Sequence, residues 1–203
     1  LKRVDLSVNV GEFVSIQGES GCGKTTLLNV LAGIESPDNG YISWCGKSIK
    51  ELRRDALAQL RGGFLGIVFQ SYYLVPEIDS LQNVLMSRRI SGGRIGSSDI
   101  EDAKNMMTKV GLGDRCKQMP NTLSGGERQR VAVARALVTE PACVLAAEPT
   151  GNLEPDTALQ VFELMLELNR EIGMSRLVDT HDPLFGKRLD ITVELKEWGL
   201  APV

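Results

Sequence analysis

The stretch Gly18-Glu19-Ser20-Gly21-Cys22-Gly23-Lys24-Thr25 combines glycines, a lysine and a threonine at a spacing suited to binding phosphate. It follows an apolar run, Phe13 to Gln17, and leads through Thr26 into a helical pattern. Glycines allow several backbone N–H groups to face one anion, and a helix N-terminus adds partial positive charge. Lys24 would reach the β- and γ-phosphates, and the Thr25 hydroxyl would bind Mg²⁺. Because a strand precedes the turn and a helix follows it, the sequence predicts a nucleoside triphosphate site rather than a simple turn.

A second segment with similar chemistry is Ser124-Gly125-Gly126-Glu127, which leads into an alanine-rich helix predicted over Val131 to Val138. Serine ahead of two glycines at a helix N-terminus is again an anion-binding arrangement. One subunit rarely needs two phosphate cradles for one nucleotide. The second segment therefore calls for an explanation that one chain alone does not supply.

Polar residues follow three predicted buried strands. Gln70 follows Phe64 to Phe69, and Glu148 follows Cys143 to Ala147. His181, the only histidine, lies just beyond the strand predicted at 176–179. Residues at the carboxyl ends of parallel strands face the ligand crevice, so all three are candidates for the site. A lone histidine is usually structural, but this position beside the phosphate site favours a functional role.

Length and composition restrict the class of protein. With 203 residues and 42% hydrophobic residues, the chain fits a single domain with a well-buried core. A formal net charge of -3 argues against a broad electrostatic grip on nucleic acid, so we expect no nucleic-acid partner. No apolar run is long enough to span a bilayer, so a partner must bring the chain to any membrane. The four cysteines are widely spaced, as suits a reducing cytoplasm; they are Cys22, Cys45, Cys116 and Cys143.

Apolar periodicity predicts strands and helices around these motifs. The irregular stretch from Ser71, with helices predicted at 81–88 and 99–110, indicates an inserted helical lobe. Within it, the adjacent Tyr72, Tyr73 and Leu74 are predicted to be exposed. The two tyrosines fit core packing and a docking surface equally well. Other predicted strands are 6–10, 13–17, 41–44 and 191–195, the last in the chain, and other predicted helices are 25–32, 51–60 and 155–172.

Taken together, the motifs resemble those of ATP-binding cassette (ABC) transporter subunits over essentially the whole chain. The run from Leu123 to Arg130 resembles the signature motif of that family and is the most specific part of the likeness. The resemblance implies an α/β P-loop NTPase (RecA-like) core with a mostly parallel sheet, an N-terminal antiparallel β part and an inserted α-helical lobe. It implies one nucleotide-binding domain over 1–203, with a core at about 1–70 and 124–203 and the lobe at about 71–123.

The resemblance also assigns roles to individual residues. Gln70 corresponds to the Q-loop glutamine, which touches Mg²⁺ or water and senses the membrane partner, Glu148 to the catalytic base, and His181 to the switch histidine at the γ-phosphate. The implied reaction is hydrolysis of ATP with Mg²⁺, which Thr25 and Gln70 would bind. Two subunits would enclose two ATPs as a homodimer or paired cassette, each phosphate loop completed by the opposite subunit. The implied nucleotide-binding residues are Gly18, Glu19, Ser20, Gly21, Cys22, Gly23, Lys24, Thr25, Thr26, Ser124, Gly125, Gly126 and Glu127.

Within the family, the run Glu148-Pro149-Thr150-Gly151-Asn152-Leu153 is similar to the lipoprotein-releasing, macrolide-export and cell-division branch. The likeness implies a peripheral subunit on the cytoplasmic face of the inner membrane, bound to integral membrane transporter subunits. Its function would be lipoprotein release or export of a hydrophobic substrate. An alternative is an ATP-dependent dimerising clamp that regulates a membrane partner with little hydrolysis. The acidic charge argues against a third possibility, a soluble ATPase acting on DNA or ribosomes.

Three departures from the family pattern concern catalysis and adenine binding. Ala147 stands where the family has the Walker B aspartate that holds Mg²⁺ through water, and Glu154 replaces the D-loop aspartate. No aromatic residue suited to stacking on adenine is evident near the N-terminus. Loss of the aspartate predicts that ATP binding survives while hydrolysis slows. Asp179 on the neighbouring strand either partly replaces the missing charge or is an independent substitution.

Overall fold

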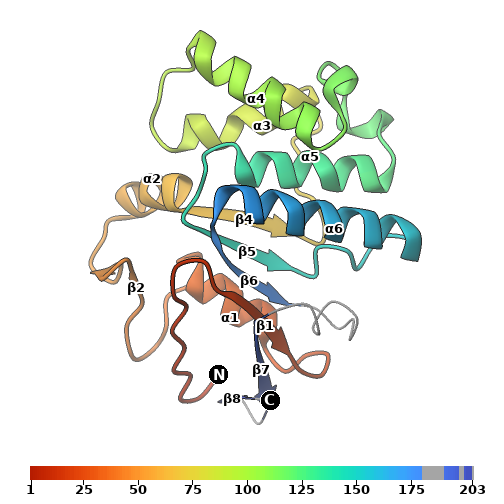
Figure 1. Ribbon diagram of the computed structural model, residues 1–203. Helices are drawn as coiled ribbons and strands as arrows, with labels where there is room; N and C mark the ends of the chain where they lie inside the picture. Colours follow the sequence, from red (N-terminus) through yellow and green to blue (C-terminus); the bar gives the residue numbers. More distant parts are fainter. Residues whose placement is uncertain (180–189, 197–198, 203) are drawn as a thin grey trace.

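The computed structural model describes residues 1–179, 190–196 and 199–202. Its centre is a six-stranded sheet in which five neighbouring strands run parallel and the last pairs antiparallel. The strands are β1 (Phe13–Gln17), β4 (Leu65–Phe69), β5 (Cys143–Ala147), β6 (Ser175–Asp179), β7 (Ile191–Lys196) and β8 (Gly199–Pro202). They lie in the order β4-β5-β6-β1-β7-β8 (Figure 1). A separate two-stranded antiparallel sheet is formed by β2 (Ser43–Trp44) and β3 (Lys47–Ser48).

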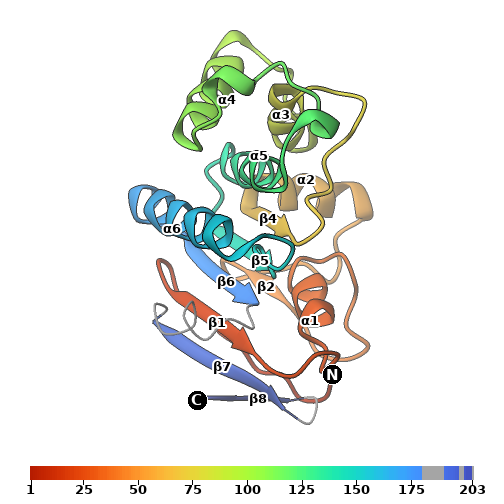
Figure 2. The same ribbon diagram turned by 90° about the vertical axis from the view of Figure 1, so that its right-hand side faces the viewer.

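Helices cover both faces of the sheet, which is why its central strands are apolar on both sides. On one face, Ile16 and Leu177 pack with Leu27 of the helix that follows β1. On the other face, Val144 and Val178 pack with residues of the helices at 125–137 and 155–172. The helices are α1 (Lys24–Leu31), α2 (Arg54–Phe64), α3 (Ser80–Ile90), α4 (Ser97–Lys109), α5 (Gly125–Leu137) and α6 (Pro155–Ile172), with short 3₁₀ turns η1 (Gly113–Arg115) and η2 (Pro120–Thr122). Figure 2 shows α1 and α6 on opposite sides of the sheet.

Helices α3 and α4 lie on the side of α5 away from the sheet (Figure 1). Their buried residues, such as Val84 and Met107, share one apolar cluster with Val131 of α5 and Val144 of β5. The predicted helical lobe therefore packs continuously with the sheet layer through α5. The boundaries predicted between lobe and core remain predictions.

Register fixes which residues share the carboxyl edge of the sheet. Phe69, Ala147, Asp179 and Ile16 are in-register neighbours across β4, β5, β6 and β1. The residues that follow these strands, including Gln70 and Glu148, consequently emerge at the same edge as the turn that begins after β1. Parallel sheets bind ligands at this edge.

The predicted fold class is confirmed, with some elements misplaced. The strand predicted at 6–10 is wrong: both edges of β1 are occupied by β6 and β7, so this segment has no edge of β1 to pair with. Its alternating Val4, Leu6 and Val8 instead pack against the α1 side of the core. The small antiparallel sheet is built by residues 43–48 and not by the segment at 6–10.

Other bounds also differ from the predictions: α2 covers Arg54–Phe64 rather than 51–60, and β2 covers Ser43–Trp44 rather than 41–44. The strand at 191–195 is not the last, because Gly199–Pro202 adds β8 at the sheet edge, where proline is tolerated. Helix α5 begins at Gly125 rather than at residue 131, because Ser124 caps it directly. No helix in the described ranges has the length and apolar content needed to cross a bilayer.

Candidate nucleotide-binding site

The turn between β1 and α1 closes tightly on itself. Gly18 and Gly23 have φ angles of 152° and 106°, which side chains rarely allow. A Cβ atom at Gly18 would lie 2.8 Å from both the Cys22 Sγ and the carbonyl oxygen of Leu195. Glycine is therefore required here by the backbone and by the space, as expected of a loop that wraps around an anion.

Lys24 supplies the cation of this loop. It is only 4% exposed, and its Nζ donates hydrogen bonds of 3.0 Å to the carbonyl oxygens of Gly18 and Glu19. A buried ammonium is costly unless an anion offsets its charge, and both of these partners are neutral. The chemistry of this donor set therefore fits a phosphate. Thr25, at the start of α1, is exposed and available to a ligand.

Gln70 and Glu148 converge on one glycine at the carboxyl edge. A Cβ atom built at Gly151 would lie 2.8 Å from Gln70 Nε2 and 3.2 Å from Glu148 Oε2. Asn152 fixes Gln70 from the same turn: Gln70 Nε2 donates to Asn152 Oδ1, and Asn152 Nδ2 donates to the Gln70 carbonyl, both at 3.1 Å. The first bond uses the amide nitrogen of Gln70 and not the side-chain oxygen that could bind a metal. The two strand ends thus bring an amide and a carboxylate together.

The backbone of Glu148 adopts an unusual conformation, with a φ of 43°. Its N–H donates to the carbonyl oxygen of Asp179 at 3.1 Å, which ties the end of β5 to the end of β6. Left-handed backbone at a non-glycine residue costs energy and is concentrated at functional sites. The turn directs the Glu148 carboxylate toward the same edge as the phosphate loop.

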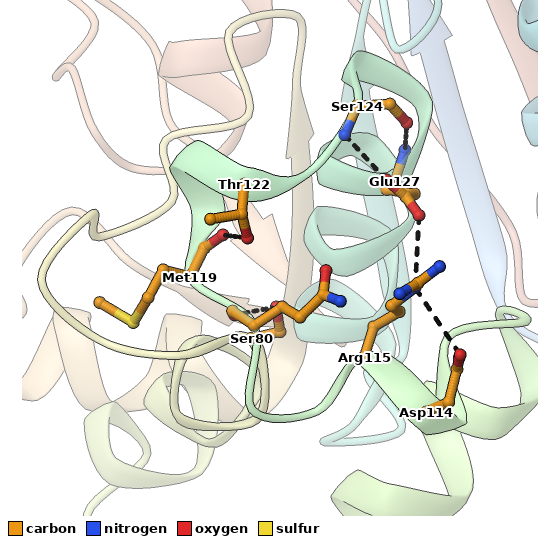
Figure 3. A network of polar contacts seen from close by, with 8 residues as sticks. Ser80, Asp114, Arg115, Met119, Thr122, Ser124 and Glu127 are labelled. Atoms are coloured by element: carbon orange, nitrogen blue, oxygen red, sulfur yellow. Dashed lines mark hydrogen bonds and ion pairs between the residues drawn. The ribbon is translucent and has the colours of Figure 1, made fainter.

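The second glycine-containing segment is a closed capping box (Figure 3). Ser124 N donates to Glu127 Oε2 at 2.8 Å, and Glu127 N donates to Ser124 Oγ at 3.2 Å. Glu127 also forms an ion pair with Arg115 at 3.6 Å, and Arg115 lies 3.7 Å from Asp114. The hydrogen bond from the Ser124 N–H, followed by smaller effects that include Arg115, lowers the pKa of Glu127.

The two glycines after Ser124 have different surroundings. A Cβ atom at Gly126 would lie 2.4 Å from Thr157 Cγ2 on α6, whereas at Gly125 the nearest atom would be 3.3 Å away, the Tyr72 hydroxyl oxygen. Gly126 is thus explained by the close approach of α5 and α6. Ser124 itself is exposed, and its oxygen accepts a bond while keeping its own proton to donate. Since α1 and α5 cover opposite faces of the sheet, this serine is not part of the phosphate loop's own surroundings.

Comparison with known proteins identifies the family. The sequence model of the family described as "ABC transporter" matches residues 1–151. The chain belongs to the ABC transporter family. It is similar to the lipoprotein-releasing system ATP-binding protein LolD of Hydrogenovibrio crunogenus, with 45% identity over 97% of this chain and 85% of that protein. LolD of Legionella pneumophila strain Paris is 44% identical over 98% of this chain and 88% of its own length.

Solved structures agree with this assignment. The dimeric ATP-binding cassette MJ0796, in a post-hydrolysis state bound to ADP and Pi, superposes with a TM-score of 0.89 and 33% identity. The match covers 100% of this chain and 90% of that one. This chain is therefore the ATP-binding subunit of an ABC transporter, in a family of ATPases.

Two residues that contact the candidate site and the segment after Gln70 are not predicted from the sequence. Asn152 was not singled out, although its place in the turn after Glu148 offered a signal. Arg135 was also missed, and its signal was a lone charge in an alanine-rich helix. Its guanidinium donates to the carbonyl oxygens of Tyr72 at 2.6 Å and Tyr73 at 2.5 Å, which hold φ angles of 59° and 46°. Burial lowers the pKa of Arg135.

The segment after Gln70 only partly matches its predicted exposure. Tyr73 is 65% exposed, with its ring edge-on to Phe69 at 5.0 Å. Tyr72 is half-buried under the Arg128 guanidinium, 5.4 Å from its ring centre, and Leu74 packs against the core. The prediction that all three are exposed is wrong for Tyr72 and Leu74, because α5 and the lobe cover them.

A groove of about 350 Å³ lies beside Tyr73, between β4, α2, α3 and α5. It is mostly apolar and is lined by residues that include Ile67, Phe69, Met86 and Arg135.

His181 lies outside the described residues, so its role as the switch histidine stays a prediction.

Proposed function

We propose that this cassette hydrolyses ATP to drive lipoprotein release, as a peripheral subunit on the cytoplasmic face of the inner membrane. The observation that carries the catalytic part is the convergence of Gln70 and Glu148 on Gly151, at the edge where the phosphate loop begins. The relatives named LolD support the substrate class. They do not favour a clamp with little hydrolysis.

Binding begins at the phosphate loop. The Lys24 ammonium exchanges its two carbonyl partners for β- and γ-phosphate oxygens, and the N–H groups at the start of α1 face the same charge. Thr25 and Gln70 are the residues that would hold Mg²⁺. In such sites few protein groups bind the ion, and oxygens of the substrate phosphates supply other ligands. When bound, Mg²⁺ neutralises charge that develops on the phosphates.

For hydrolysis, the Glu148 carboxylate accepts a hydrogen bond from the attacking water and orients it toward the γ-phosphate. Gln70, which Asn152 anchors, is assigned a position beside that water. His181 is assigned to the γ-phosphate, as the resemblance implies.

A second subunit completes the site. The Ser124 hydroxyl is exposed and keeps a proton to donate, so it suits the γ-phosphate of a nucleotide held by another copy. The similar cassette MJ0796 was solved as a dimer. We therefore place two ATPs between two head-to-tail subunits.

The membrane subunits are proposed to dock at the groove beside Tyr73. Phe69 and Tyr73, which line this groove, stand on either side of Gln70 in the chain, so a partner seated there would act on the residue that senses the nucleotide. Arg135 holds the Tyr72 and Tyr73 backbone in its strained form and would transmit displacement of this segment.

The test is reconstitution of this chain with its membrane subunits in proteoliposomes loaded with a triacylated lipoprotein. ATP-dependent release is expected for the parent and is expected to vanish in Glu148→Gln. Glu167→Gln, which changes an exposed carboxylate on α6, is the matched control and should release lipoprotein like the parent. ATP hydrolysis without any release would reject the substrate class, and equal hydrolysis in Glu148→Gln would reject the catalytic assignment.

A further inference from the structure

Asp179 is a charged residue in an in-register row of the sheet whose other members, Phe69, Ala147 and Ile16, are apolar. It is the last residue of β6 and is 0% exposed. Its in-register neighbours are Ala147 on β5 and Ile16 on β1. Burial of a carboxylate is costly unless a charge or hydrogen bonds offset it. Asp179 is thus a fully buried carboxylate at the ligand edge of the sheet.

The side chain of Asp179 belongs to the face covered by α1. In-register residues of parallel strands share a face, and so do residues two apart on one strand. Leu177 and Leu145, two residues before Asp179 and Ala147, both pack with Leu27 of α1. Asp179 thus occupies the layer between the sheet and the helix whose first residues are Lys24 and Thr25.

We propose that Asp179 supplies from β6 the carboxylate that acts through water on the Mg²⁺ of bound ATP, in place of the side chain that Ala147 lacks on β5. The proposal rests on the proposed function, since it concerns the metal of the same ATP site. In P-loop NTPases an aspartate on the strand that precedes the catalytic residue holds Mg²⁺ together with the P-loop threonine or serine. Asp179 is a positioning residue in this scheme, because its contact with the metal passes through water.

The register makes this relocation physically reasonable. Compared with an aspartate at position 147 on β5, the carboxylate of Asp179 on β6 is displaced by one strand spacing, about 4.8 Å. This displacement is toward β1, because β6 lies between β5 and β1. Ile16 of β1, the in-register neighbour of Asp179, is two residues before Gly18 of the phosphate loop. The Asp179 carbonyl already accepts the Glu148 N–H at 3.1 Å, so the two strand ends are held together.

The pair also explains why Ala147 is small. Carboxylates on both in-register positions would lie side by side in a buried layer and repel each other, which destabilises the pair. One aspartate and one alanine leave a single negative charge in this row of the sheet. A single aspartate on either β5 or β6 would leave one charge in the row, and in this chain the aspartate is on β6.

The experiment exchanges the two side chains. The parent, Asp179→Val and the double variant Ala147→Asp with Asp179→Val are compared by electron paramagnetic resonance of Mn²⁺ in the presence of ATP. Removal of an outer-shell group should weaken Mn²⁺ binding by about 10- to 100-fold in Asp179→Val. The double variant should recover the parent affinity. ATP affinity in EDTA, measured by calorimetry, should be the same in all three proteins, which a general structural defect would not allow.

Two outcomes would overturn the proposal. One is Mn²⁺ affinity that Asp179→Val leaves unchanged, and the other is a loss that the double variant does not recover. If Asp179→Val does not fold, Asp179→Asn keeps the volume without the charge and is read in the same way. A parent that binds no ATP at all would instead reject the proposed function.

Discussion

The two glycine-rich segments of this chain look alike in sequence and differ in physics. In the phosphate loop, glycine is needed for the backbone: Gly18 and Gly23 have φ angles that side chains rarely allow. In the capping segment, Gly125 and Gly126 lie within an ordinary helix, and Gly126 is fixed by Thr157 of α6. Glycine can therefore mark either a cradle or a close helix contact.

Charge separates the two segments more clearly. The phosphate loop encloses the buried cation Lys24, whereas the capping segment carries the anion Glu127 at its helix N-terminus. A carboxylate there stabilises the helix but leaves little positive potential for a triphosphate. The second segment offers one hydroxyl, from Ser124, and needs a cation from elsewhere. In the proposed dimer it is half of a site.

The largest expected effect concerns the cation that only the first segment has. Lys24→Ala should weaken ATP affinity by about 2 to 4 kcal/mol, because the triphosphate loses its main side-chain countercharge. Ser124→Ala, the matched change in the second segment, should leave ATP binding to isolated monomers unchanged. Calorimetry at low protein concentration checks both. Equal losses in the two variants would mean that both segments bind the same ATP in one chain.

A smaller effect should follow from filling the space at Gly126. Gly126→Ala should lower the free energy of unfolding by about 1 to 3 kcal/mol, because its methyl group meets the Thr157 Cγ2. Gly125→Ala should change it by less than about 0.5 kcal/mol, since its surroundings are looser. Thr157→Ser removes the opposing methyl and should rescue Gly126→Ala in urea unfolding. Without rescue, Gly126 would have another role than helix contact.

The smallest effect concerns the capping box. Glu127→Ala should cost about 1 kcal/mol of stability at neutral pH, as loss of a helix cap does. The folded-state pKa of Glu127 is lowered below the value of 4.5, so its charge stabilises the fold above that pH. This contribution should fade as the pH falls through the folded-state pKa. A difference in melting temperature between parent and variant that stays constant down to pH 3 would contradict this cause.

Much of this arrangement is predictable from sequence. The strand Cys143–Ala147 and the helix Pro155–Ile172 have the predicted bounds, because buried parallel strands and amphipathic helices leave strong apolar patterns. The phosphate loop is recognisable because each of its residue types has a separate chemical role: the glycines free the backbone, the lysine offsets phosphate charge, and the threonine hydroxyl is a metal ligand. The placement of Gln70 and Glu148 at one edge is predictable because the ends of parallel strands share one edge of the sheet.

Other features depend on tertiary packing that no local pattern records. The strand predicted at 6–10 alternates correctly, yet both edges of β1 are already occupied. The contact between Gly126 and Thr157 joins positions 31 residues apart along the chain. The register that places Asp179 beside Ala147 likewise becomes visible only when β5 and β6 are paired.

The central claim is that the two segments meet only between two copies of the chain. Light scattering of Glu148→Gln at saturating Mg-ATP tests this most directly, because slowed hydrolysis should trap the ATP-bound assembly. We expect a dimer for Glu148→Gln and a monomer when Ser124→Arg is added, since the arginine side chain fills the space of the γ-phosphate. Folded Glu148→Gln that binds ATP and remains a monomer would contradict the claim, as would a dimer that Ser124→Arg leaves intact.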